Sequence, residues 1–264
     1  SILMCIVAII VRIVYGYYCK KHFIECTYHF YWDKDVFYKM FKFAGWNFIG
    51  AASSVIRDQG GNILINVFFG PAVNAARGIA IQVNGAVMSF VNNFMTAINP
   101  QITKSYAAGD KEYMMKLIYQ GARLSFYMLL LLSLPVIVNA HYILVVWLKI
   151  VPDHTVAFVQ LILVSAMCES ISNPLITAML ATGNIKKYQI IVGSLQLMNV
   201  PICYLFFRLG YFPESVMIIS IIMSQCCLFV RLFLLRKMIG LSSILFFKKV
   251  YFNILLVSLA SVLF

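Results

Sequence analysis

Long apolar stretches follow one another along almost the whole chain, and they restrict its fold more than any other feature. A transmembrane helix needs roughly 20 apolar residues to cross ~30 Å of hydrocarbon. We predict spans at residues 1–19, 43–69, 73–98, 117–138, 155–181, 188–207, 215–235 and 250–264, the last shortened by the chain end. With 62% hydrophobic residues and a mean hydropathy of +0.88, lipid must be part of the solvent. The sequence therefore predicts an all-α, polytopic transmembrane helical bundle.

Lys and Arg residues are concentrated in every second connection between these spans. One alternate set of connections contains Lys20, Lys21, Lys34, Lys39, Lys42, Lys104, Lys111, Lys116, Lys186, Lys187, Arg236, Lys237, Lys248 and Lys249. The other set contains only Lys149 and Arg208. Cytoplasmic loops carry an excess of Lys and Arg, so we predict that residues 20–42 are cytoplasmic. The basic residues form no single patch, which argues against nucleic acid as a partner.

The stretch "CKKHFIECTYH" combines residue types that bind metals. Four of them recur at helical spacing and form one stripe: Cys19, His22, Cys26 and His29. Ligands on one straight face cannot surround a tetrahedral zinc ion, so we predict no metal site. Aromatic and basic residues share this segment, and we expect residues 20–42 to lie along the lipid headgroups as an amphipathic segment. All seven cysteines fall in spans or on the cytoplasmic side, where structural disulfides are rare.

The predicted span in "GWNFIGAASSVIRDQGGNILINVFFG" (45–70) carries two charges near its middle. At a helix centre, Arg57 and Asp58 cost roughly 2.5–3.5 kcal/mol each if they face lipid. Neighbours in sequence point ~100° apart around a helix, so we do not expect these two charges to neutralise each other. Each then needs a partner on another helix, a water-filled cavity or a ligand. Gly60 and Gly61 loosen the helix just beyond them and are a candidate hinge.

The next predicted span carries a polar stripe that includes an arginine. Five residues come within about 80° of one another at helical spacing: Asn74, Arg77, Asn84, Asn92 and Asn99. Such a stripe along a membrane helix indicates the wall of an aqueous pathway. For any single asparagine, an interhelical hydrogen bond remains the alternative.

Three further charged residues lie in later spans. Arg123 enters the span at 117–138, and Glu169 precedes Pro174 in "CESISNPL". Arg231 is closer to the cytoplasmic end, where we expect its side chain to snorkel toward the surface. Because arginines outnumber acids within the spans, a cavity lined by these residues would attract anions.

Two similar stretches, "SYAAGDKEYMMKL" (105–117) and "AMLATGNIKKYQI" (178–190), fall at cytoplasmic turns between spans. Gly109 and Gly183 suit a left-handed helix end. Asp110 and Asn184 suit the N-cap of the helix that follows. The likeness between the two stretches is weak evidence of an internal duplication.

Three longer stretches resemble a known family: "FAGWNFIGAASSVIRDQGGNILINVFFGPAVNAARGIAIQVNGAV", "NPQITKSYAAGDKEYMMKLI" and "PLITAMLATGNIKKYQIIVGSLQLMNVPICYLFF". They look like the second half of a polysaccharide flippase of the O-antigen or lipopolysaccharide type, in the multidrug/oligosaccharidyl-lipid/polysaccharide exporter superfamily. The resemblance implies two six-helix lobes facing a central cavity in the bacterial inner membrane. Residues 1–19 would be the last helix of a first lobe that this chain otherwise lacks. Residues 20–42 would link the lobes, 43–238 would form the second lobe, and 239–264 would be an extension with a truncated helix.

A hypothesis of the mechanism follows and assigns a role to each candidate residue. An undecaprenyl-pyrophosphate-linked oligosaccharide would be the substrate, and no cofactor is expected beyond a coupling sodium ion or proton. The pyrophosphate would be neutralised by Arg57, Arg77 and Arg123, and the sugar hydroxyls would be bound by Asn62, Asn84 and Asn92. The coupling ion would bind Asp58 or Glu169, and the hinges would be Gly60, Gly61 and Pro100.

Three alternatives remain open. A multidrug exporter of the same superfamily, coupled to a cation, would need an acid-rich cavity for cationic drugs. A membrane enzyme of polysaccharide assembly would need reacting groups at one membrane face, where His141, Asp153 and His154 are the only candidates and form no recognisable arrangement. A helical scaffold without a transport role would use its charged residues only for structure.

Overall fold

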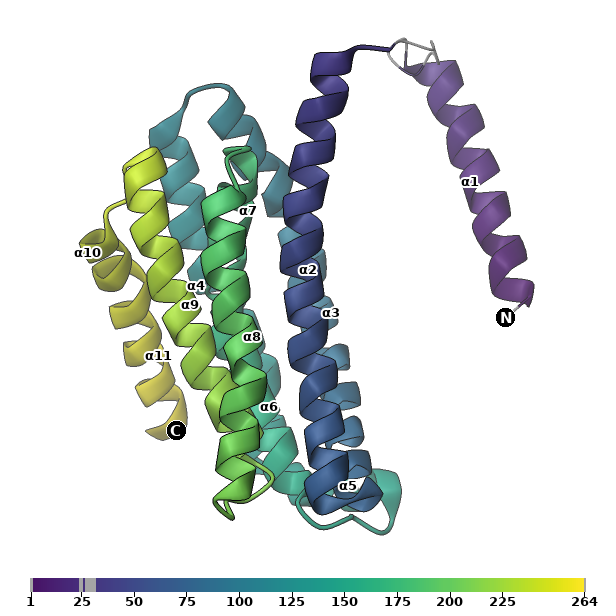
Figure 1. Cartoon of the computed structure of the whole chain (residues 1–264), viewed down its shortest axis with the longest axis vertical. Helices are drawn as coiled ribbons and strands as arrows, with labels where there is room; N and C mark the ends of the chain where they lie inside the picture. Colours follow the sequence, from purple (N-terminus) through teal and green to yellow (C-terminus); the bar gives the residue numbers. More distant parts are fainter. Residues whose placement is uncertain (1, 24–25, 27–31, 264) are drawn as a thin grey trace. The chain divides into compact units, whose positions relative to one another are not determined.

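Helices joined by short turns make up the structure, a computed structural model that describes residues 2–23, 26 and 32–263 (Figure 1). No strand occurs within those ranges, which confirms the predicted all-α fold. The elements are α1 (Ile2–His22), α2 (Lys34–Phe69), α3 (Pro71–Ala107), α4 (Lys111–Val138), α5 (Ala140–Leu148), α6 (Thr155–Ser170), α7 (Asn173–Ala181), α8 (Lys186–Arg208), α9 (Ser215–Ile239), α10 (Ser243–Phe246), the π-helix η2 (Phe247–Tyr251) and α11 (Phe252–Leu263). Contacts divide the chain into two units, Ser1–Lys42 and Phe43–Phe264.

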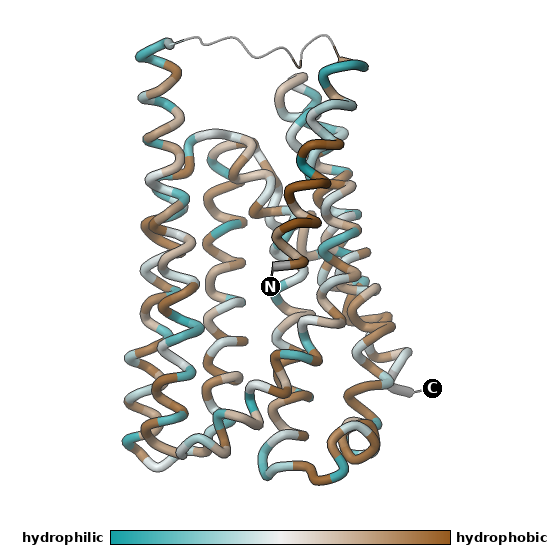
Figure 2. Tube along the Cα trace, turned by 90° about the vertical axis from the view of Figure 1, so that its right-hand side faces the viewer, coloured by the Kyte–Doolittle hydropathy of each residue, from teal (hydrophilic) through white to brown (hydrophobic). Residues whose placement is uncertain are grey.

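Six helical segments of the described chain are long and apolar enough to cross a membrane: Leu3–His22, Lys111–Val138, Thr155–Ala181, Lys186–Arg208, Ser215–Ile239 and Ser243–Ser261. They match six predicted spans and confirm a polytopic membrane bundle. The other two predicted spans, 43–69 and 73–98, lie within α2 and α3, which are helical over 36 and 37 residues. These two helices are more polar because they carry the charged pair and the asparagine stripe. Hydrophilic residues occur at mid-helix as well as at the turns (Figure 2).

Helix α2 begins at Lys34, ahead of the predicted span. Asp33 Oδ1 accepts hydrogen bonds from the backbone N–H groups of Asp35 (2.8 Å) and Val36 (3.2 Å), so Asp33 caps this helix. The predicted linker, residues 20–42, therefore overlaps the end of α1 and the first residues of α2. The stripe of Cys19, His22, Cys26 and His29 cannot be followed to its end, because His29 lies outside the described residues.

The core of the second unit is built around α3. This helix packs along α4, α6 and α7, while α9 packs along α6 and α8 (Figure 1). The core side chains with no solvent exposure include Ile102, Met114, Leu129, Phe158 and Leu163. Many other large apolar side chains remain exposed on the outward faces of the helices. Such extended apolar surfaces are typical of proteins whose outer faces contact lipid.

The turns within the two similar stretches confirm the prediction at three of four positions. Gly109 and Gly183 have φ angles of 76° and 69°, as predicted for left-handed helix ends. Asp110 caps α4 by accepting a hydrogen bond from the Tyr113 N–H at 3.0 Å. The prediction for Asn184 is wrong, because α8 begins one residue later, after Ile185, and has no side-chain cap.

The predicted span 155–181 is interrupted near its middle. Helix α6 ends at Ser170, and α7 begins at Asn173 after a turn at Ile171 and Ser172. Pro174 stands in the first turn of α7, a position where its missing N–H group leaves no helical hydrogen bond unmade, so it favours a new helix start here. Transporters commonly place binding groups at such helix breaks, and Glu169 occupies the last turn of α6.

Candidate functional site

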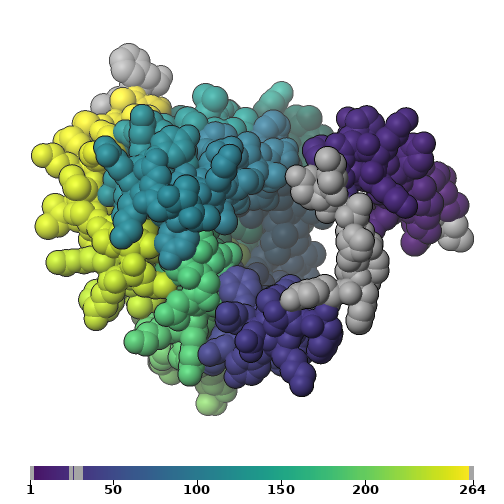
Figure 3. Space-filling model, turned by 90° about the horizontal axis from the view of Figure 1, so that it is seen from above, coloured from purple at the N-terminus to yellow at the C-terminus, as the bar shows by residue number. Residues whose placement is uncertain are grey.

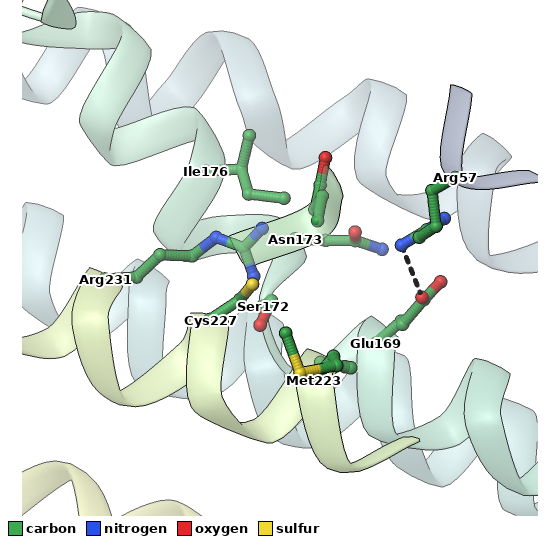
Figure 4. Close-up of a pocket in the computed structure, with 10 residues that line it drawn as sticks. Arg57, Glu169, Ser172, Asn173, Ile176, Met223, Cys227 and Arg231 are labelled. Atoms are coloured by element: carbon green, nitrogen blue, oxygen red, sulfur yellow. Dashed lines mark hydrogen bonds and ion pairs between the residues drawn. The ribbon is translucent and has the colours of Figure 1, made fainter. Parts of the chain in front are cut away.

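Arg57 is half-buried on α2 and contacts two carboxylates. Its Nε donates a hydrogen bond to Oδ1 of Asp58 at 2.9 Å, and its Nη1 lies 3.5 Å from Oε1 of Glu169 on α6 (Figure 4). The prediction that Arg57 and Asp58 do not neutralise each other is wrong. An arginine side chain is long enough to turn back along the helix surface, so the ~100° between the two positions does not separate their end groups. Glu169 is a partner on another helix, one of the possibilities that the sequence allowed.

Arg77 is buried on α3, with 7% of its surface exposed. Its Nη1 donates to Oδ1 of Asn62, and its guanidinium packs against α2 at Gly61, where a Cβ atom would lie 3.4 Å from Nη2. Among the described residues no carboxylate lies within 4.0 Å of Arg77, and its Nε has no hydrogen-bond partner. Burying an unpaired charge is costly, so this guanidinium is a candidate binding group.

These side chains line one cavity of about 330 Å³ between α2, α3, α6 and α9. It brings together six of the predicted site residues: Arg57, Asp58, Asn62, Arg77, Asn84 and Glu169. Oδ1 of Asn84 is buried and has no partner in the described part of the chain. Small-molecule pockets have volumes of roughly 300–1,000 Å³, so this cavity admits part of a substrate. Seen from above, the surface between α2 and α3 is recessed (Figure 3).

The remaining predicted residues lie elsewhere. Arg123 lines a different pocket, with Lys116 of α4 and Lys249 of η2. Asn92 is exposed on α3 and does not line the cavity. Pro100 lies within α3, which continues without a break to Ala107. The structure therefore groups only part of the predicted set.

Several polar side chains of α2 and α3 bind neighbouring helices instead of lining the cavity. Asn47 Oδ1 accepts a hydrogen bond from Gln189 Nε2 at 3.0 Å, and Ser54 Oγ donates to Gln196 Oε1 at 2.9 Å; both glutamines are on α8. Asn99 Oδ1 accepts from Thr177 Oγ1 of α7 at 2.8 Å. For Asn99, a member of the predicted stripe, the alternative of interhelical hydrogen bonding is correct.

Glycines bring α2 and α8 close together. A Cβ atom at Gly60 would lie 2.6 Å from Cγ2 of Val200, and one at Gly193 would lie 3.0 Å from Oγ of Ser53. Gly60 and Gly61 lie inside the unbroken helix α2. In this structure Gly60 therefore allows close helix packing, and its role as a hinge stays a prediction.

Some cavity residues carry no recognisable signal in the sequence. Ser165 of α6 and Ser220 of α9 line the cavity, and Ser220 Oγ accepts a hydrogen bond from Asn199 Nδ2 at 3.2 Å. Isolated serines in apolar helices give no periodic signal. The expectation for Arg231 is wrong, because this residue is 6% exposed and does not snorkel to the surface.

No group of three His, Cys, Asp or Glu side chains within the described ranges comes close enough to hold a metal ion. His22 Nδ1 lies 3.0 Å from the carbonyl oxygen of Tyr18 on its own helix. In the second unit, His154 Nδ1 lies 2.6 Å from Oε1 of Glu214, an acid that the enzyme alternative did not consider.

A membrane bundle of this kind, with charged side chains gathered in an internal cavity, has the architecture of a transporter. Residues 61–205 match the MatE family, so the chain belongs to this family of the multidrug/oligosaccharidyl-lipid/polysaccharide exporter superfamily. Members of the family are membrane transporters, which argues against the membrane-enzyme and scaffold alternatives. No curated protein and no solved structure matches the chain.

Proposed function

We propose that this exporter moves a polyprenyl-pyrophosphate-linked oligosaccharide from the cytoplasmic to the outer leaflet of the bacterial inner membrane. The observation that carries the proposal is Arg77, a buried guanidinium that faces the cavity without a carboxylate partner in the described chain. A buried positive charge without a carboxylate partner favours the binding of an anionic group. The planar guanidinium also matches the geometry of phosphate oxygens.

The neighbouring side chains suit the same substrate. Arg57 lines the cavity beside Arg77 and would bind the pyrophosphate once it is released from Glu169. Asn84 has a free amide oxygen that would accept a hydrogen bond from a sugar hydroxyl. Asn62 already accepts from Arg77, so we assign it to positioning that guanidinium. Asn92 and Arg123 lie away from the cavity and have no role in this proposal.

Asp58 and Glu169 remain the candidates for a coupling sodium ion or proton. Both carboxylates line the cavity, and both contact Arg57. An anionic substrate that binds Arg57 would weaken these contacts and free a carboxylate for the coupling ion. A first lobe would supply the opposite wall, and rocking of the two lobes would alternate access to it.

A cation-coupled multidrug exporter is the second candidate function. The exposed fractions of the Asp58 and Glu169 side chains are 57% and 41%, against 21% for Arg57. Both acids are therefore more accessible to a cationic drug than Arg57 is to an anion. The MatE family fits this alternative at least as well.

Flipping of a fluorescent lipid-linked oligosaccharide in proteoliposomes of the whole protein tests the proposal. Losing a hydrogen-bonded charge from a buried site weakens binding by about 10- to 150-fold, so Arg77→Gln should lose flipping at low substrate concentration. Arg236→Gln, an exposed change at the end of α9, is the control. The proposal fails if Arg77→Gln flips the lipid normally, or if the parent protein exports cationic dyes and does not move the lipid.

A further inference from the structure

A second polar cavity adjoins the first. Its volume is about 130 Å³, and it lies between α2, the α6–α7 break, α8 and α9. Its lining includes Ser172, Asn173 and Arg231, and it shares Arg57 and Glu169 with the first cavity (Figure 4). Pockets for drug-sized molecules start at roughly 300 Å³, so this cavity has room for a small ion.

Arg231 supplies a buried positive charge to this cavity. It projects from α9 toward Ser172 and Cys227 (Figure 4) and is 6% exposed. Its guanidinium carbon lies 6.0 Å from the centre of the Tyr188 ring. Nε has no hydrogen-bond partner, and no carboxylate of the described chain lies within 4.0 Å. A guanidinium cannot lose its proton to escape this cost, so the site favours an anion.

The start of α7 lies on the same wall, where Ser172 and Asn173 line the cavity. Ser172 precedes this nine-residue helix, is 2% exposed, and its Oγ has no partner within the described part of the chain. The first N–H groups of a helix have no partner inside it and carry a partial positive charge, although Pro174 removes one of them. A helix start combined with an unpartnered hydroxyl and a guanidinium is the arrangement that binds phosphate groups.

The charge balance of the two cavities also favours an anion here. Arg57 contacts both acids, Asp58 and Glu169, whereas Arg77 and Arg231 contact neither. Three guanidinium groups therefore face two carboxylates, and the excess is positive. Glu169 lines the second cavity too, but its Oε1 lies 3.5 Å from Nη1 of Arg57, which offsets its charge.

We infer that the second cavity binds a phosphate group, held by Arg231, the Ser172 hydroxyl and the first turn of α7. The inference does not depend on the proposed function, because none of these three groups lines the larger cavity. A phosphate in solution and a phosphate in a lipid headgroup share this chemistry, and the experiment separates the two sources.

Saturable binding of radiolabelled inorganic phosphate to the whole protein, in nanodiscs of phosphatidylcholine, tests the inference. Arg231→Gln should weaken binding by about 10- to 150-fold, and Ser172→Ala by about 2- to 13-fold. Arg236→Gln, an exposed change on the same helix, should leave phosphate binding unchanged. Normal flipping of the lipid-linked oligosaccharide by Arg231→Gln, together with lost phosphate binding, would separate this site from the transport proposal.

Folding controls and a competitor complete the experiment. Arg231→Lys keeps the charge and should retain part of the binding even if Arg231→Gln proves unstable in size-exclusion chromatography. If polyprenyl phosphate in the nanodisc displaces the label, the site takes a lipid headgroup; if it does not, the site takes free phosphate. The absence of saturable binding of either phosphate source, or equal binding by Arg231→Gln and Arg236→Gln, would overturn the inference.

Discussion

Replacing Gly60 by Ala tests the close packing of α2 against α8. The new Cβ atom would lie 2.6 Å from Cγ2 and 3.2 Å from Cγ1 of Val200, whereas carbon atoms pack best at about 3.5–4.0 Å. Overpacking of this kind typically costs about 1–3 kcal/mol. Alanine also favours the helix by roughly 0.5–1 kcal/mol over glycine, so the net destabilisation is about 0–2.5 kcal/mol.

A matched change on the same helix isolates the steric effect. Gly45 has no atom within 4 Å of its Cβ position, so Gly45→Ala should show only the favourable helix preference. The free energies of unfolding of the two variants should therefore differ by about 1–3 kcal/mol. Val200→Ala removes both clashing atoms and should restore most of the loss in Gly60→Ala.

Thermal unfolding of the purified protein in detergent, followed by the fluorescence of its three tryptophans, measures these differences. Equal stability of Gly60→Ala and Gly45→Ala would refute the packing argument. So would a loss in Gly60→Ala that Val200→Ala leaves uncorrected, because the clash would then lie elsewhere.

Two further substitutions examine the turns and the ion pair. Asp110→Ala should destabilise the protein by about 1 kcal/mol, because it removes the side-chain cap of α4. Asn184→Ala should change the stability little, because Asn184 caps no helix. Thermal unfolding of both variants checks this, and equal effects would contradict it. Glu169→Gln removes one of the two carboxylates that contact Arg57. It should tighten phosphate binding by about 1.5- to 5-fold, the factor that corresponds to the free energy of a partly exposed ion pair. Weaker phosphate binding in the nanodisc assay would contradict the charge balance.

The helical fold could be predicted because membrane spans have a strong signal in single sequences. Runs of apolar residues set the helices, and glycines with φ > 0, such as Gly109 and Gly183, set two of the turns. Helix ends were harder, because they depend on local hydrogen bonds. Asp33 extends α2 into the predicted linker, and Pro174 divides a span that hydropathy alone makes continuous.

The site could be predicted only in part, because periodicity gives a face of one helix and not its neighbour. Arg57 and Arg77 were identified by the cost of burying their charge, and both line the cavity. Neither the periodicity nor the cost of burying a charge indicates that Asn99 contacts Thr177 or that Arg123 lines another pocket. The burial of Arg231 could not be predicted either, because its position near a helix end indicated an exposed charge.

Arg57 and Glu169 line both cavities, so a solute in either one contacts the same two side chains. Two binding events that draw on one pair of groups are thermodynamically coupled. If occupancy of the smaller cavity changes affinity in the larger one, the larger must change affinity in the smaller by the same factor. Because the Arg57 Nη1–Glu169 Oε1 contact of 3.5 Å borders both cavities, we expect binding in one cavity to change the affinity of the other.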